Sequence, residues 1–197
     1  MPEELIQAGF AALITPPGAV ELTEKPDEDS KTGGFIGKAK EPLGIYIQRV
    51  SVVDNFSQRP PFDHLNDSIY RRLIRDFIDG AAMPESKVAA LSREADDHRT
   101  NSLDDSNIQF SMIDGLQRLF CYDIAILLVL YREKLVAQGL ITAQAWEYFK
   151  ETVEDTGEAT AAIRELLQRP MRYEIFYNIN LAGLLHYMVT FNTAQRR

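Results

Sequence analysis

The chain has 197 residues, of which 45% are hydrophobic and 25% are charged. This is ordinary globular composition, enough for one domain with a real core. The net charge of −8 disfavours non-specific binding to nucleic acid, because the phosphate backbone repels an acidic protein, although a local basic patch would override that repulsion.

A single cysteine, Cys121, excludes an internal disulfide and favours a cytoplasmic protein. The first ten residues carry acids where a secretory signal would carry lysine or arginine. The longest apolar run, residues 124–131, is far shorter than the roughly 20 residues that cross a bilayer. We therefore expect no membrane partner, and we expect Cys121 to be an inert thiol of the core.

Residues 1–42 are predicted to form a flexible N-terminal region. Within it, residues 24–34 are polar, acidic and rich in glycine at their end, which is typical of a surface loop or a disordered linker. Residues 44–53 (GIYIQRVSVV) alternate in part and are rich in β-branched side chains, so they are the best strand candidate. The SQRPPF segment at 57–62 would end that strand.

The next expected element is a helix over residues 69–80, because its apolar residues recur on one helical face. These residues are Ile69, Leu73, Ile74, Phe77 and Ile78. Asp67 or Ser68 would cap its start, and Gly80 would end it. A short strand at 87–91 and an exposed loop at 92–107 are expected to follow.

The rest of the chain alternates between strand-like and helix-like patterns. The expected elements are a strand at 108–113, a helix from 116 to about 138, a helix capped by Thr142, a helix at about 156–167, a strand at 173–180, and a helix at 181–189 for which strand is the alternative.

The passage from the strand at 108–113 into the following helix is a device for binding anions. A helix N-terminus presents unpaired amide groups and the positive end of the helix dipole. Gly115 permits a close approach, and Arg118 in the first turn has a guanidinium that could bind two phosphate oxygens. Gln117 can donate or accept beside it, and Asp114 could cap the helix, hold a metal or position a water. The simpler alternative is a turn with a helix cap.

Three segments resemble the DGQQR-motif family. They are FSQRPPFDHLNDSIYRRLIRDFIDGAAMPE, FSMIDGLQRLFCY and YEIFYNINLAGLLHYMVTFNTAQR. The second is similar to the central "hDGQQRLxT" motif of that family, in which h is an apolar residue. The order and rough spacing of the segments agree over about residues 44–197.

The resemblance implies a ParB/sulfiredoxin-like α+β fold, with a small mixed sheet and surrounding helices. It places this domain at residues 43–197, with a helical insertion at about 139–169. The family includes the NTP-handling subunit of GmrSD-type restriction systems, so the resemblance implies NTP binding with Mg²⁺, metal-dependent hydrolysis, and a role in DNA restriction or phage defence. The matching residues are Asp114, Gly115, Gln117 and Arg118 in the motif, Gln58, Arg59 and Pro60 in the first segment, and Asn192, Thr193 and Gln195 in the last.

The implied catalytic residues are Asp114, Gln117 and Arg118, with Asp114 as the metal ligand. The implied nucleotide-binding residues are Gly115, Arg118, Arg59, Gln58, Asn192 and Gln195. Expected partners are a nucleotide, DNA or a separately encoded nuclease subunit.

Two departures separate this chain from the family pattern. Leu116 stands where the family usually has glutamine, and Ala194 replaces the usual glycine. A rival hypothesis is therefore a non-enzymatic scaffold, or a DNA- or protein-binding subunit, with a degenerate nucleotide site. The three histidines form no HNH-like pattern, so nuclease activity by that route is not expected, and neither a zinc site nor a Walker A motif is present in the sequence.

The arginines at 71, 72 and 75 cluster on the helix predicted for 69–80. A solvated face diluted by nearby aspartates is one interpretation, and a contact surface for DNA is the other.

Overall fold

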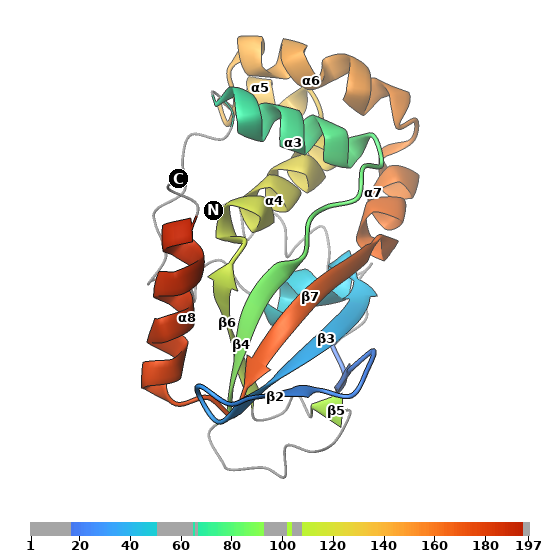
Figure 1. Cartoon of the computed structure of the whole chain (residues 1–197). Helices are drawn as coiled ribbons and strands as arrows, with labels where there is room; N and C mark the ends of the chain where they lie inside the picture. The colour runs from blue at the N-terminus through green and yellow to red at the C-terminus, as the bar shows by residue number, and fades with distance from the viewer. Residues whose placement is uncertain (1–16, 51–64, 66, 93–101, 104–107, 195–197) are drawn as a thin grey trace. The chain divides into compact units, whose positions relative to one another are not determined.

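The computed structural model describes residues 17–50, 65, 67–92, 102–103 and 108–194. The protein is of the α+β class, and the described residues form a five-stranded mixed sheet, a two-stranded sheet and seven helices (Figure 1). They divide into two compact units. We call them the sheet unit (described parts of 17–50, 84–116 and 170–194) and the helical unit (described parts of 65–83 and 117–169).

The main sheet has the strand order β2-β3-β7-β4-β6. Its strands are β2 (Asp27–Asp29), β3 (Gly34–Pro42), β7 (Pro170–Tyr177), β4 (Ser86–Ser92) and β6 (Ile108–Asp114). The β4–β7 pair is parallel, and the other three neighbouring pairs are antiparallel. The second sheet pairs β1 (Val20–Glu21) with β5 (Ser102–Leu103).

Successive residues of β7 point to opposite faces of the sheet, as strand geometry requires. Phe176 belongs to a buried cluster with Ala89, Ile113 and Leu184, against which α8 (Leu181–Ala194) packs. Tyr173 lies on the other face, where its ring centroid is 5.0 Å from that of Tyr46 in α2 (Leu43–Arg49). The sheet is therefore covered by a helix on each face.

The helical unit contains α3 (Ser68–Ile78), α4 (Leu116–Tyr131) from its second residue onwards, α5 (Lys134–Ala137), α6 (Ala143–Asp155) and α7 (Ala159–Gln168). Its core includes Ile74, Phe77, Tyr122, Phe149 and Ile163. Side chains cap the starts of α3, α6 and α7, which gives unpaired amides there a hydrogen-bond acceptor. The cap residues are Asp67 for α3, Thr142 for α6 and Glu158 for α7.

Several sequence predictions are confirmed. The helix at 69–80, its cap at Asp67 and its end at Gly80 (φ 99°) are present, although Ile69 is 72% exposed and lies outside the core. The strands at 87–91, 108–113 and 173–180 correspond to β4, β6 and β7. The helices capped by Thr142, near 156–167 and at 181–189 correspond to α6, α7 and α8.

Three sequence predictions are wrong. Residues 44–53 were expected to be a strand, but residues 43–49 form α2, whose buried Leu43 and Tyr46 and the following Val50 recur at helical spacing. The expected weak organisation of residues 1–42 does not hold from residue 17, because β1, β2 and β3 lie there. The helix expected from 116 to 138 is interrupted after α4 by Arg132, whose φ is 50°.

The remaining predictions fall wholly or mainly outside the described residues. They concern residues 57–62 and most of the loop expected at 92–107, of which only Ser92 in β4 and the two residues of β5 are described. Among the helices that the structure describes, none is long and apolar enough to cross a membrane.

The turn between β2 and β3 is tied to α8 through Asp29. Its carboxylate accepts hydrogen bonds from the Thr32 hydroxyl (2.5 Å), from the Lys31 amide (3.1 Å) and from the Tyr187 hydroxyl. These bonds lower the pKa of Asp29 from 3.8 to about 2. The bond from Thr32 contributes most to this shift, followed by the bond from Tyr187. The charged form of Asp29 therefore stabilises the docking of α8 on the hairpin.

Gly34 lies where no side chain fits. A Cβ there would be 2.5 Å from Cγ2 of Ile179 and 2.8 Å from the carbonyl oxygen of Tyr177. We predict that Gly34→Ala lowers the free energy of unfolding by about 1–3 kcal/mol, measured by urea denaturation. Gly18→Ala is the matched control, because its Cβ would meet nothing within 4 Å. Equal unfolding midpoints for the two variants would contradict the packing described here.

The lowered pKa of Asp29 predicts an acid-dependent stability. The charged carboxylate of Asp29 stabilises the folded state above the unfolded pKa of 3.8. This stabilisation is lost as the pH falls towards the folded pKa of about 2. Asp29→Asn should remove this component, so its unfolding free energy should fall less steeply over that range. The measurement is denaturant unfolding at several pH values, with Asp27→Asn on the same strand as the control. Parallel pH profiles for wild type and Asp29→Asn would refute the assignment.

Candidate functional site

The turn that leads from β6 into α4 has the form that the motif predicts. β6 ends at Asp114, Gly115 follows with a φ of 114°, and α4 begins at Leu116. A positive φ of this size is strained for residues with a Cβ, so glycine suits this position. The first amides of α4 then lack partners within the helix and carry the positive end of its dipole.

The structure places the predicted motif residues as follows. Asp114 and Gly115 belong to the sheet unit, whereas Gln117 and Arg118 lie in the first turn of α4 and belong to the helical unit. All four are half-buried. Gly115, rather than Asp114, stands directly before the helix, which leaves Asp114 as the last residue of the strand.

Leu116 is buried, with 5% of its surface exposed. The family pattern has a polar glutamine at this position, and a buried leucine replaces its hydrogen-bonding groups with apolar surface. Residue 116 therefore offers no polar side chain at this turn.

A row of alternating charges crosses the sheet towards the end of β6. In register, Lys38 of β3 faces Glu174 of β7, Glu174 faces Lys87 of β4, and Lys87 faces Asp114 of β6. A β-bulge between Lys87 and Val88 breaks the regular ladder beside Asp114. Such bulges often lie next to functional sites, where they redirect side chains.

Lys87 lies between the two acidic residues of this row, Glu174 and Asp114. Its ammonium group forms an ion pair with Glu174 and lies 4.8 Å from the centroid of the Phe191 ring on α8. Lys38 pairs with Glu24 at 2.8 Å. The hydrogen bond that its ammonium group donates to Glu24, followed by the negative charge of Glu24, raises the pKa of Lys38. Sequence reasoning missed Lys87 and Glu174, because the strand register that aligns them is not visible in a linear sequence.

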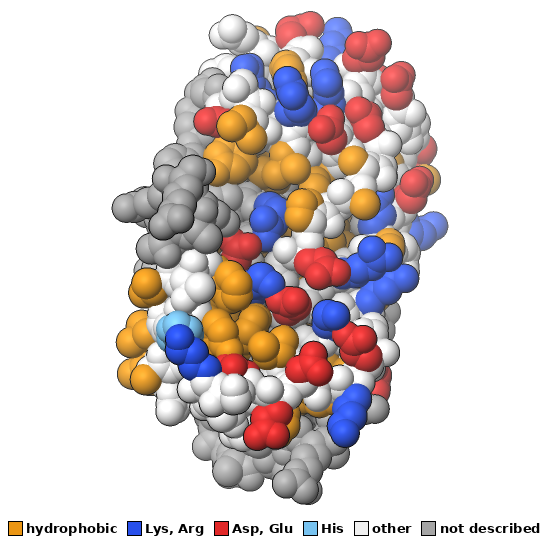
Figure 2. All heavy atoms as spheres, in the orientation of Figure 1, with side chains coloured by type: hydrophobic (Ala, Val, Ile, Leu, Met, Phe, Trp, Pro, Cys, Tyr) orange, Lys and Arg blue, Asp and Glu red, His pale blue; other side chains and the backbone are white. Residues whose placement is uncertain are grey.

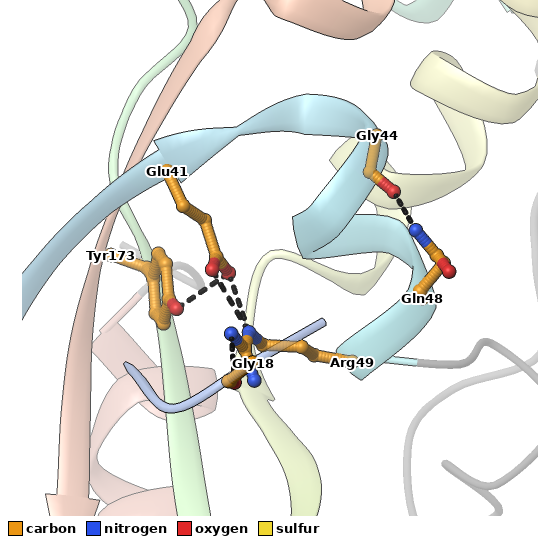
Figure 3. A network of polar contacts seen from close by, with 6 residues as sticks. All are labelled: Gly18, Glu41, Gly44, Gln48, Arg49 and Tyr173. Carbon is orange, nitrogen blue, oxygen red and sulfur yellow. Dashed lines mark hydrogen bonds and ion pairs between the residues drawn. The ribbon is translucent and has the colours of Figure 1, made fainter. Parts of the chain in front are cut away.

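A second polar network is buried on the α2 face of the sheet (Figure 3). Nε of Arg49 donates to both carboxylate oxygens of Glu41 at 3.0 and 2.9 Å, and a terminal nitrogen donates to the carbonyl of Gly18 at 2.8 Å. The Tyr173 hydroxyl donates to Glu41 at 2.6 Å. The side chains of Arg49 and Glu41 are only 2% and 12% exposed.

This network joins four segments of the sheet unit rather than presenting a reactive group. Burial, and then the neighbouring charge of Glu41, raises the pKa of Tyr173, so its hydroxyl keeps its proton and donates. Nearby, the hydroxyls of Tyr46 and Ser86 share a buried hydrogen bond of 2.5 Å. The sequence indicated none of this, because Glu41 and Arg49 resemble ordinary surface charges.

The other predicted site residues are not brought to the turn by the described structure. Gln58, Arg59 and Gln195 lie outside the described residues. Asn192 lies within α8, and its side chain is also outside the description. Cys121 is buried as expected, and burial raises the pKa of its thiol to about 12.

Metal binding by side chains alone has no support in the described part of the chain. There, no three His, Cys, Asp or Glu residues are placed to hold one ion. Comparison of the chain with models of protein families, with curated proteins and with solved structures finds no match.

The buried ion pair yields a prediction. Glu41→Gln would leave the charge of Arg49 without its carboxylate, so we predict a loss of about 3–5 kcal/mol in the free energy of unfolding. The same substitution at Glu24, whose pair with Lys38 is 54% and 51% exposed, should cost at most about 1 kcal/mol. Denaturant unfolding of both variants measures the difference, and equal losses would contradict a structural role for the network.

Proposed function

We propose that the protein is a nucleotide-binding module that holds the phosphates of an NTP at the β6–α4 turn. The main supporting observation is local: a strand ends at Asp114, Gly115 takes a positive φ, and a sixteen-residue helix begins at Leu116. Helix N-termini that follow a glycine after a strand bind phosphates in several nucleotide-binding folds. The proposed fold is the ParB/sulfiredoxin-like variety of the α+β class.

Each motif residue has a distinct role in this proposal. The first amides of α4 donate to phosphate oxygens, and the guanidinium of Arg118 binds them in a bidentate manner. Gln117 orients the attacking water or a phosphate oxygen. Arg59, Gln58, Asn192 and Gln195 are the further nucleotide contacts that the resemblance implies.

Asp114 is the proposed ligand for Mg²⁺. A single carboxylate fits this ion, because Mg²⁺ usually binds one or two carboxylates together with substrate phosphates and waters. When bound, the ion would neutralise charge that develops on the phosphates, and hydrolysis would then need only a positioned water.

Lys87 places a positive charge at the end of the sheet where β6 finishes. It is the register partner of Asp114, and its ammonium group forms an ion pair with Glu174. A triphosphate would compete with Glu174 for this ammonium group. We therefore include Lys87 among the residues that tune the affinity of the proposed site.

The proposed setting is a cytoplasmic DNA restriction or phage-defence system, as the sequence resemblance implies. A nuclease, if one acts with this protein, is proposed to be a separate subunit that contacts DNA.

A non-enzymatic scaffold is the second candidate function. The observation that favours it is the burial of Leu116, since an apolar residue has replaced one polar position of the motif. Thermal unfolding with ATP, GTP, CTP or UTP, each with Mg²⁺, separates the two candidates, because a ligand that binds only the native state raises its stability. A higher melting temperature with any of them supports nucleotide binding, and none with all four supports the scaffold.

The role of Arg118 is tested by calorimetry with the nucleotide that raises the melting temperature most. Arg118→Ala removes charge-assisted hydrogen bonds worth about 1.5–3 kcal/mol, so affinity should fall by about 10- to 150-fold. Arg164→Ala, an exposed position on α7, is the control and should bind like wild type. Unchanged affinity in Arg118→Ala would remove this residue from the proposed site.

A further inference from the structure

Two arginines of α3 share one aromatic ring of α6. Arg71 and Arg75 are four residues apart and therefore lie on the same face of α3. Their guanidinium carbons are 4.8 and 5.4 Å from the centroid of the Tyr148 ring. All three side chains belong to the helical unit and are half-buried, so the ring holds two like charges at a partly desolvated surface.

These two charges have no carboxylate partner among the described residues. The ion pairs of the described residues involve Lys38, Arg49, Lys87 and Arg169. Nε of Arg71 is buried and has no hydrogen-bond partner among the described residues. Asp67, one turn before Arg71, uses its carboxylate to cap the amides of Ile69 and Tyr70. Two adjacent guanidinium groups therefore remain without a neutralising anion within the unit.

We propose that Arg71, Arg75 and Tyr148 form a binding site for a phosphoryl group. A phosphate monoester carries up to two negative charges near neutral pH, which matches two guanidinium groups better than a single carboxylate does. The Tyr148 ring lies within cation–π distance of both guanidinium groups and restricts their movement, so less entropy is lost when they bind oxygens. The neighbouring Arg72 is exposed and adds a third positive charge to α3.

This site is separate from the β6–α4 turn and uses none of its residues. The phosphoryl group could come from free phosphate or from the 5′ end of a nucleic-acid strand, and the experiment distinguishes these sources. The three probes are inorganic phosphate, a short single-stranded oligonucleotide with a 5′-phosphate, and the same oligonucleotide without it. Binding is followed by calorimetry for phosphate and by fluorescence anisotropy for the oligonucleotides.

The test variant is Arg71→Lys with Arg75→Lys, which keeps both charges but removes the planar forks. We expect binding of at least one phosphorylated probe to weaken by about tenfold or more, because each lost fork removes charge-assisted hydrogen bonds. The matched control is Arg72→Lys with Arg164→Lys, two exposed arginines of the same unit, and it should bind like wild type.

The possible results are decisive. Loss with inorganic phosphate assigns the site to a free phosphoryl group, and loss confined to the 5′-phosphorylated oligonucleotide assigns it to a strand end. Equal weakening of the unphosphorylated oligonucleotide overturns the proposal, because the forks would then contact the diester backbone. Full affinity in the Arg71→Lys/Arg75→Lys variant, or no binding of any probe to the wild-type protein, also overturns it.

Discussion

The parallel pairing of β4 with β7 is the constraint on which the sheet unit depends. Two parallel neighbours need a long crossover, and here β6 and the whole helical segment 117–169 lie between them in the chain. The pairing places β7 between β3 and β4, and leaves β6 as the outer strand beside β4. Asp114 therefore ends an edge strand, and the chain leaves the sheet at that point through Gly115 into α4.

Charged side chains have three different roles around this framework. Arg49 and Glu41 form a buried ion pair that joins segments of the sheet unit. Removing either side chain would leave the other as an uncompensated buried charge. Lys87 and Glu174 are partly exposed beside the end of β6, where an anion can compete for the ammonium group. On the face visible in Figure 2, acidic, basic and hydrophobic side chains are interspersed. Arg71 and Arg75 differ from both pairs, since their guanidinium groups lie against the aromatic ring of Tyr148.

The sequence predicted those elements whose side chains alternate or recur clearly, such as β6, β7 and α3, and it placed the motif turn between a strand and a helix. It failed at β3, because the buried positions of that strand include Gly34, Gly37 and Ala39, which carry little apolar signal. It misread residues 44–53, where β-branched residues favour a strand but α2 packing prevails. The charged row across the sheet could not be predicted, because it depends on strand register.

The central claim is that phosphates bind at the start of α4, and backbone amide chemical shifts measured by NMR test it most directly. On titration with an NTP and Mg²⁺, the account predicts the largest shifts at the amides of Gly115, Leu116 and Gln117, because the positive end of the helix dipole lies at these amides. If the shifts cluster at other positions while these three amides stay unchanged, phosphate binding at this turn is contradicted.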